Sequence, residues 1–187
     1  MTREEAAPAF SDAIAHLTPL EDRTAIWPAI RLRQRTCVAG IPWPDVMISS
    51  CRAVVFRRSA VVVVRDQFTS HITPGGRREG GETAEETTRR EVLEETGWRL
   101  GPLTPLGFRH FQHLGERPPD FAYPWCDFIQ PIFIAEGVSW DRAASDLTQI
   151  EIGSSLVPIH RALRDLQPWE AALLQAARDA RRNQADA

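Results

Sequence analysis

The chain has 187 residues, which suits one domain with a small appendage. Its net charge of −3 gives no bulk attraction to polymeric nucleic acid or anionic membranes, and no apolar run reaches the roughly 20 residues that span a bilayer. The first residues do not have the pattern of a signal peptide, and the 3 widely spaced cysteines show no metal-ligand pattern, so we expect a cytoplasmic protein with reduced thiols.

The first 45 residues are predicted to form an N-terminal extension of the main domain. Residues 7–17 carry apolar side chains at near-helical spacing. Residues 41–45 include Pro42 and Pro44 and cannot continue a helix. We therefore expect residues 1–45 to be helical with an irregular connector, packed on a domain of residues 46–187.

Strand signals begin after this connector. Residues 51–57 and 60–65 are β-branched runs around a short connection, which predicts a hairpin. The run 61–64 is four valines, as expected of a strand covered on both faces. Residues 71–73 are a short strand candidate that ends at Pro74, Gly75 and Gly76.

A helix is predicted over residues 83–96. Thr83 and Glu86 have the spacing of a capping box, and Gly97 stands where a left-handed C-terminal cap belongs.

The rest of the chain is predicted to return to strands and end in a helix. Strands are expected at residues 103–112, 125–136 and 151–157, with Pro131 indicating an edge position or a bulge. A last helix begins near Pro168, with a stripe of small and apolar residues that includes Ala172 and Leu173. Strands on both sides of a helix, with helices at both ends, predict an α/β fold with a mixed sheet between helices.

Three carboxylates crowd one face of the predicted central helix. At about 100° per residue, Glu91, Glu94 and Glu95 fall within an arc of about 100°. Each like-charged pair costs a few tenths of a kcal/mol unless a cation intervenes, and oxygen ligands favour Mg²⁺, with Mn²⁺ as the alternative. Gly75 and Gly76 just before the helix allow close approach of the backbone to a ligand. Metal, carboxylates and a glycine turn together suit the hydrolysis of a phosphoanhydride.

Residues 76–98 resemble an unbroken Nudix box: Gly, five residues, Glu, seven residues, Arg-Glu, an apolar residue, any residue, Glu-Glu, any residue, Gly and an apolar residue. The resemblance implies a Nudix-type α/β/α sandwich and hydrolysis of a nucleoside diphosphate linked to another moiety. It assigns metal binding to three glutamates and one backbone carbonyl, namely Glu91, Glu94, Glu95 and Gly75. It makes Glu82 and Arg90 orienting groups of the catalytic site.

Substrate contacts are expected outside the motif. The candidates are Arg77, His110, Tyr123 and Trp125. A polar side chain on a strand explains His110 at least as well, and aromatic residues such as Tyr123 and Trp125 more often belong to a core or a dimer interface. The partner is then a small nucleotide-like diphosphate, and a homodimer is compatible with the sequence.

The sequence does not identify the general base, because the three helix glutamates can all be occupied by metal. Members of the resembled family then often recruit an acid from a distant loop or strand end, and Glu151 is the candidate that resembles it here, with Asp146, Asp141 and Glu136 as alternatives.

Two other functions are compatible with this scaffold. A nucleotide sensor without turnover would keep the fold, but such modules usually lose acids of the motif, and here all are present. An isomerase of allylic diphosphates would need a cysteine and a further glutamate in the site, and Cys126 is only a remote candidate for the cysteine.

Overall fold

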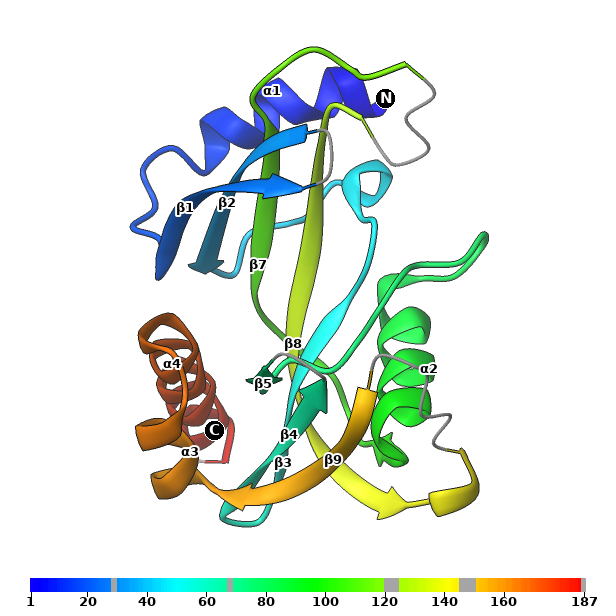
Figure 1. Cartoon of the computed structure of the whole chain (residues 1–187), viewed down its shortest axis with the longest axis vertical. Coiled ribbons are helices and arrows are strands. Elements are labelled where there is room, and N and C mark those ends of the chain that lie inside the picture. Colours follow the sequence, from blue (N-terminus) through cyan, green and yellow to red (C-terminus); the bar gives the residue numbers. More distant parts are fainter. Residues whose placement is uncertain (28–29, 67–68, 120–124, 145–150, 186–187) are drawn as a thin grey trace.

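Helices cover both faces of a curled β-sheet in the computed structural model, which describes residues 1–27, 30–66, 69–119, 125–144 and 151–185 (Figure 1). The elements in chain order are α1 (Arg3–Ala13), β1 (Glu21–Trp27), β2 (Ile30–Val38), η1 (Asp45–Met47), β3 (Arg52–Arg57), β4 (Ala60–Asp66), β5 (Ser70–His71), α2 (Ala84–Thr96), β6 (Trp98–Leu100), β7 (Thr104–His113), β8 (Asp127–Trp140), η2 (Arg142–Ala144), β9 (Glu151–Pro158), α3 (Ile159–Asp165) and α4 (Pro168–Ala185).

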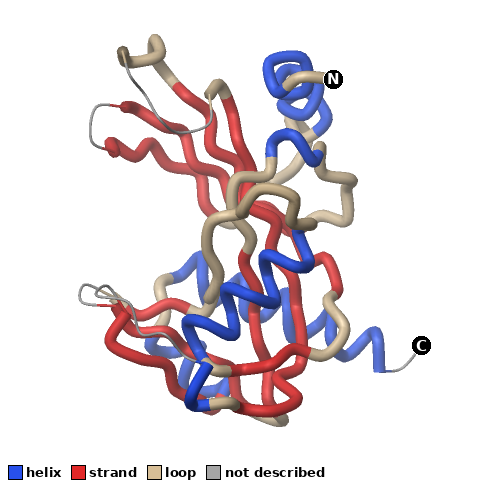
Figure 2. The backbone as a smooth tube through the Cα atoms, turned by 90° about the vertical axis from the view of Figure 1, so that its right-hand side faces the viewer, coloured by secondary structure: helices blue, strands red, loops and turns tan. Residues whose placement is uncertain are grey.

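The sheet is mixed, as predicted. Its strand order is β1-β2-β7-β8-β3-β4-β5, with β6 added to β8 and β9 added to β4. Strand β3 runs parallel to β8, whereas β7 runs antiparallel to β8. Figure 2, which looks onto α2, shows this helix crossing in front of the strands. The α/β class and the sandwich of a mixed sheet between helices are confirmed.

The central strands are buried on both faces. Val61 belongs to the core cluster that includes Leu173 of α4, while its neighbour Val62 belongs to the cluster that includes Val92 of α2. Each fully buried valine contributes roughly 1.5–3 kcal/mol relative to an exposed one. The valine run therefore joins the two helical layers through one strand, as its composition predicted.

Helix α1 covers the other end of the sheet. Its Phe10 packs edge-on against Phe108 of β7, with ring centroids 5.3 Å apart, and the same cluster takes in Met47 of η1. Figure 1 shows α1 beside β2 and β7, away from α2 and α4. Among the described residues, no helix combines the length and apolar character needed to cross a membrane.

The prediction of a helical segment with an irregular connector was wrong for much of residues 1–45. Helix α1 is present, but β1 and β2 are strands, and β2 pairs with β7 from Leu32 opposite His113 onward. Alternate positions of β2 from Ile30 to Thr36 are buried, yet two of them are the polar Gln34 and Thr36. Both side chains donate hydrogen bonds to the carboxylate of Glu21 on β1, at 2.7 and 3.2 Å. Because these buried positions are polar, the sequence of β2 does not show the alternation of apolar and polar residues that predicts a strand. The boundary at residue 45 stays a prediction.

Pro131 occupies neither the edge nor the bulge that its presence indicated. Strand β8 lies between β7 and β3, and the bulge of the β7–β8 pair is on β7, between Pro105 and Gly107. The continuous parallel ladder with β3 begins at Ile132, one residue after Pro131. A residue without an amide hydrogen is tolerated there because that ladder has not yet started.

The remaining elements follow the prediction closely. The hairpin turns at Arg58, which has a φ of 55°, and strands β7, β8 and β9 lie near the predicted ranges. Helix α4 begins at Pro168, but it buries Leu173, Leu174 and Ala177. Ala172, predicted on the buried stripe, is exposed. The short elements β6 and α3 were not predicted.

Candidate functional site

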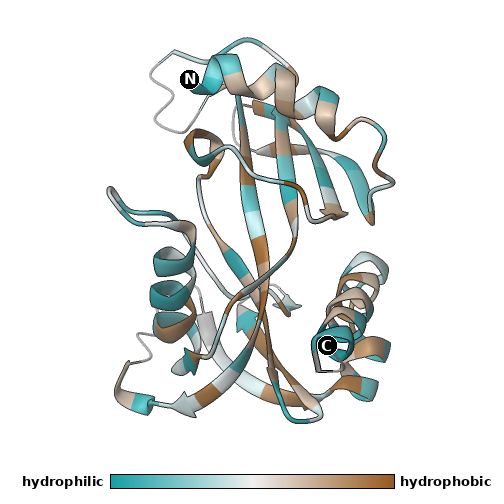
Figure 3. Ribbon diagram, turned by 180° about the vertical axis from the view of Figure 1, so that it is seen from behind, coloured by the Kyte–Doolittle hydropathy of each residue, from teal (hydrophilic) through white to brown (hydrophobic). Residues whose placement is uncertain are grey.

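Helix α2 has well-defined ends, which fixes the direction of its acidic face. The Thr83 side chain accepts a hydrogen bond from the Glu86 amide at 3.2 Å, and the Thr83 amide donates to the Glu86 carboxylate at 2.8 Å. Gly97 has a left-handed φ of 74° and donates its amide to the Leu93 carbonyl at 2.8 Å. The predicted caps are confirmed, and an N-cap of this kind contributes about 1 kcal/mol. Figure 3 shows the helix largely in hydrophilic colours.

Arg90 is the centre of the ion-pair network on α2. Its guanidinium bonds both carboxylate oxygens of Glu82, with Nε–Oε1 2.6 Å and Nη2–Oε2 3.0 Å. Its Nη1 donates to Glu91 at 2.9 Å and to Glu94 at 3.2 Å, while Nη2 donates to the Arg77 carbonyl at 3.0 Å. One guanidinium therefore fixes the loop before the helix and two acidic side chains on it.

Glu82 is the strongest partner of this guanidinium. Its hydrogen bonds with Arg90 lower the pKa of Glu82 from 4.5 to about 2. It also accepts a hydrogen bond from the Thr87 hydroxyl at 2.9 Å. The geometry is that of an orienting group, since a bidentate pair fixes both partners in one plane.

We expect Glu82 to make the folded state sensitive to acid. A carboxylate with a lowered pKa in the folded state contributes stability above its unfolded pKa and loses it as the pH falls through the folded value. The window for this loss runs from about pH 4.5 down to about pH 2. Urea unfolding at several pH values should show a shallower loss in this window for Glu82→Gln than for the wild type. An identical slope in both proteins would contradict the role of this pair.

The glycine turn packs directly against the acids of α2. The Gly75 amide donates to Glu95 Oε2 at 2.8 Å. At Gly76 an added methyl group would overlap the carboxylate of Glu91, and at Gly75, where φ is 139°, it would overlap the Cys51 carbonyl. Glycine is therefore a steric requirement at Gly75, whereas a side chain at Gly76 would displace the Glu91 carboxylate.

The backbone of the turn is held to β3 on either side of Gly75. The Pro74 carbonyl accepts the Ala53 amide at 3.0 Å, and the Gly76 carbonyl accepts the Cys51 amide at 2.9 Å. The Gly75 amide, between them, faces Glu95. The turn thus joins the start of β3 to the acidic face of α2.

The donor set suits Mg²⁺ or Mn²⁺, but the three carboxylates do not converge. Arg90 draws Glu91 and Glu94, whereas Glu95 bonds the Gly75 amide. Within the described part of the chain, no three acidic, histidine or cysteine side chains gather closely enough to hold a metal. The Glu94 side chain is 46% exposed and can rotate toward a cation at little cost. The residue types therefore fit a hard cation, and a rearrangement of side chains would complete the site.

Glu91 is the most buried of the three acids. Its side chain is 15% exposed, and burial raises the pKa of its carboxyl group, although Arg90 and the more distant Arg52 act in the opposite direction. A buried carboxylate of this kind gains from a nearby cation. Arg52 was missed by the sequence analysis because one arginine among the 22 basic residues carries no local signal.

The structure does not bring the predicted substrate residues together. Arg77 is exposed beside the glycine turn. His110 is fully buried and bonds Asp127 at 3.1 Å and Arg35 at 3.1 Å, on the side of the sheet that α1 covers. Trp125 stacks at a tilt on the ring of His113, with centroids 4.1 Å apart. Tyr123 lies outside the described residues.

The candidates for the general base are spread over several elements. Glu151 is the first residue of β9, opposite Asp66 of β4, and its side chain is outside the described part of the structure. Glu136 forms an ion pair with Arg181 of α4, and Asp141 pairs with Arg99 at 3.0 Å, so both alternatives have cationic partners. Asp146 lies outside the described residues.

The cysteine that an isomerase would use is not at this site. Cys126 packs against the cluster formed with α1. Cys51, which is close to the turn, is fully buried, and burial raises the pKa of its thiol to about 11. Neither thiol suits proton transfer at the acidic face of α2.

Comparison with known proteins finds a family match over the part of the chain that contains this site. The family model described as NUDIX domain matches residues 48–177. No curated protein matches the chain. A pyrophosphohydrolase of Bacillus subtilis, BsRppH in a mutant form, has 21% identity and a TM-score of 0.53 over 67% of this chain and 72% of its own.

Two further solved structures have a similar fold. A NUDIX hydrolase from Nitrosomonas europaea has 19% identity and a TM-score of 0.55 over 71% of this chain and 90% of its own. A structure described as ADP compounds hydrolase has 15% identity and a TM-score of 0.52, over 90% of this chain and 95% of its own. At these identities the likeness is one of fold.

Proposed function

The chain belongs to the Nudix hydrolase family, and we propose that it hydrolyses a diphosphate bond in a small nucleotide-like substrate by attack of a metal-activated water. The observation that carries this proposal is the Arg90-centred array of carboxylates packed on the Gly75–Gly76 turn. Oxygen ligands beside a backbone turn suit phosphoanhydride hydrolysis, which supports the proposal.

The proposed metal is Mg²⁺, with Mn²⁺ as the alternative, held by Glu91, Glu94, Glu95 and the Gly75 carbonyl. When bound, the cation neutralises phosphate charge and lowers the pKa of a coordinated water. The carbonyls on both sides of Gly75 already accept hydrogen bonds from β3, which supports the Gly75 carbonyl as the one that faces a ligand.

The protein's own groups position this chemistry. Arg90 orients the buried Glu91, contacts the more exposed Glu94, and is itself held by Glu82. Arg77 is exposed at the turn and is proposed to contact a phosphate of the substrate. The amide groups at the start of α2 add a weak attraction for the same anion.

We propose Glu151 as the general base, because the metal would occupy the three glutamates of α2. The Glu151→Gln variant should have lower turnover, little change in apparent Mg²⁺ affinity and no acidic limb in its pH–rate profile. Steady-state kinetics across pH would measure this. Near-normal turnover at saturating substrate would exclude Glu151 and leave the base among the helix glutamates or the other loop acids.

A substrate screen tests the proposed activity. Nucleoside triphosphates, oxidised nucleotides, ADP-ribose and nucleotide sugars are incubated with the protein and Mg²⁺ or Mn²⁺, and products are separated by chromatography. We expect a phosphorylated product from at least one diphosphate. Saturable binding of a nucleotide without any turnover would instead favour a sensor. A cytoplasmic location and a homodimer stay predictions.

A further inference from the structure

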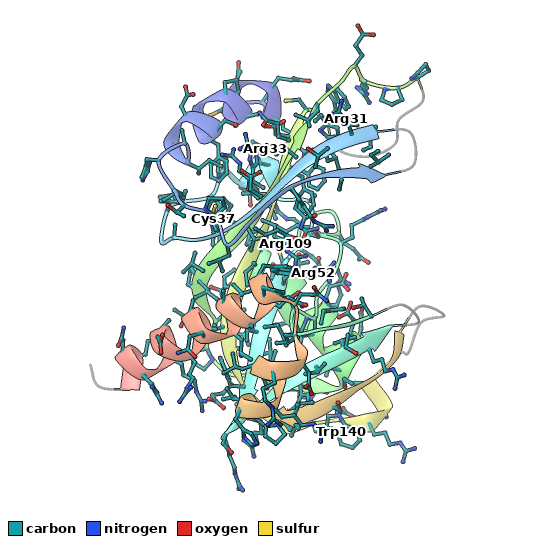
Figure 4. All side chains as sticks on the ribbon, turned by 60° about the vertical axis from the view of Figure 1, so that its left-hand side comes forward. Arg31, Arg33, Cys37, Arg52, Arg109 and Trp140 are labelled. Atoms are coloured by element: carbon teal, nitrogen blue, oxygen red, sulfur yellow. The ribbon has the colours of Figure 1, made fainter. Side chains whose placement is uncertain are left out.

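A second polar site lies on the face of the sheet opposite α2. It is a cavity of ≈ 600 Å³ between β1, β3, β7, the segment at β5 and the start of α4. Its cationic lining includes Arg52 and Arg109, and its acidic lining includes Glu170. Figure 4 shows Arg52 and Arg109 close together beside the first turn of α4.

The two arginines lack carboxylate partners within the part of the chain that the structure describes. The Nε atoms of Arg52 and Arg109 are buried without a hydrogen-bond partner there. Burial, followed by repulsion from Arg52, lowers the pKa of Arg109 to about 10. An unsatisfied buried donor costs about 1–3 kcal/mol, and more when it is charged. An anion between the two guanidinium groups would remove this cost.

The nearby carboxylate of Glu21 does not fill this role. Glu21 already binds Arg23 at 2.9 Å, Gln34 at 2.7 Å and Thr36 at 3.2 Å. The guanidinium of Arg109 lies over the ring of Trp169, 4.5 Å from its centroid, which fixes its plane. The guanidinium of Arg109 is therefore held in a fixed orientation in the cavity, and it can still donate a hydrogen bond to a ligand.

Glu170 gives the same cavity an acceptor. The residue is 3% exposed, and burial raises the pKa of its carboxyl group. The backbone amides of Ile72 and Gln167 bond this carboxylate, yet Oε1 is buried without a partner among the described residues. Unsatisfied donors beside an unsatisfied acceptor fit a ligand that carries both an anion and a hydroxyl group.

The cavity and the acidic face of α2 meet at the glycine turn. Thr73 lines the cavity and accepts a hydrogen bond from Arg52, only two residues before Gly75 binds Glu95. A group bound to Arg52 in the cavity is therefore next to the segment that leads into the turn.

We propose that this cavity binds the phosphorylated sugar part of the diphosphate substrate, with Arg52 and Arg109 on a phosphate and Glu170 on a sugar hydroxyl. The proposal rests on the proposed function. It commits the substrate to a sugar-linked diphosphate, with Arg52 holding the phosphate beside the glycine turn. It also explains why three buried polar atoms around one cavity have no described partner within the chain.

Titration calorimetry with ribose 5-phosphate tests the cavity directly, using the full chain without metal. We expect binding to the wild type and to Arg161→Gln, a control that removes a charge from the exposed pair with Asp165. Arg109→Gln should weaken binding by about tenfold or more, since bonds to charged groups are strong. Arg52→Gln is a second variant in case Arg109→Gln does not fold. Unchanged affinity in either folded variant would overturn the proposal.

A comparison of inorganic phosphate with ribose 5-phosphate separates recognition of the phosphate from recognition of the sugar. Phosphate alone should bind more weakly than ribose 5-phosphate, and Glu170→Gln should weaken only the sugar phosphate. Equal affinities for phosphate and ribose 5-phosphate would overturn the hydroxyl contact, and binding of phosphate that no arginine variant alters would mean an adventitious ion only.

Kinetics distinguish failure of the cavity from failure of the proposed activity. If a sugar-linked diphosphate is hydrolysed, Arg109→Gln should raise KM with a smaller effect on kcat. Turnover with an unchanged KM would overturn the cavity proposal and leave the hydrolase intact. Binding of ribose 5-phosphate that depends on Arg109, without turnover of any diphosphate, would overturn the hydrolase and keep the cavity as a sugar-phosphate site.

Discussion

Replacing Glu95 with Gln should lower turnover by about two orders of magnitude or more while the fold survives, because the change removes one anionic group of the proposed metal site and preserves shape. The amide oxygen of Gln can still accept the hydrogen bond that the Gly75 amide donates at 2.8 Å. Glu94→Gln should behave similarly, and both variants relieve like-charge repulsion worth a few tenths of a kcal/mol. Turnover with Mg²⁺ and thermal unfolding measure the two effects separately.

Glu85 provides the matched control for this experiment. It is an exposed acid in the first turn of the same helix, so Glu85→Gln makes the same change of charge away from the proposed ligands. We expect near-normal turnover and only a small loss of stability from the helix dipole. If Glu95→Gln lost thermal stability in proportion to activity, Glu95 would be a structural residue.

Removal of divalent metal should abolish activity altogether. After treatment with EDTA and gel filtration, we expect no turnover, restoration by millimolar Mg²⁺ or Mn²⁺, and none by Ca²⁺. The oxygen donors of α2 accept all three ions, but the smaller ions enforce the compact octahedral geometry that phosphate hydrolysis uses. Full turnover after rigorous chelation would exclude the metal-based mechanism.

Thermal unfolding gives an independent readout of the same site. A ligand that binds only the folded state stabilises it by about 2.7 kcal/mol at one hundred times its Kd. Mg²⁺ should therefore raise the Tm of the wild type more than that of Glu95→Gln. An equal rise in both proteins would place the cation elsewhere.

The acidic helix could be predicted because its determinants are neighbours in the sequence. The Thr83–Glu86 capping box and the Gly97 cap lie within one turn of the helix ends. The spacing of Arg90 and Glu94 is that of an ion pair along a helix, and the structure contains this pair at 3.2 Å. The same holds for the valine strand, whose two buried faces follow from composition alone.

The N-terminal strands could not be predicted because their stabilising partners are distant or on another strand. Buried Gln34 and Thr36 are satisfied by Glu21 across the β1–β2 pair, so the expected alternation of apolar residues is absent. The sequence made His110 a candidate substrate contact. Its burial between Arg35 and Asp127 follows only when β2, β7 and β8 are assembled.

The sequence by itself determined the family, the acidic helix and the glycine turn, since each depends on short-range spacing and backbone chemistry. Tertiary structure alone decided that the Gly75 amide donates a hydrogen bond to Glu95, which is 20 residues away along the chain. It also decided that Arg52, Arg109 and Glu170 line one cavity, because three separate elements must pack before these groups lose water together. Desolvation is a property of the assembled fold, so no local pattern could have indicated it.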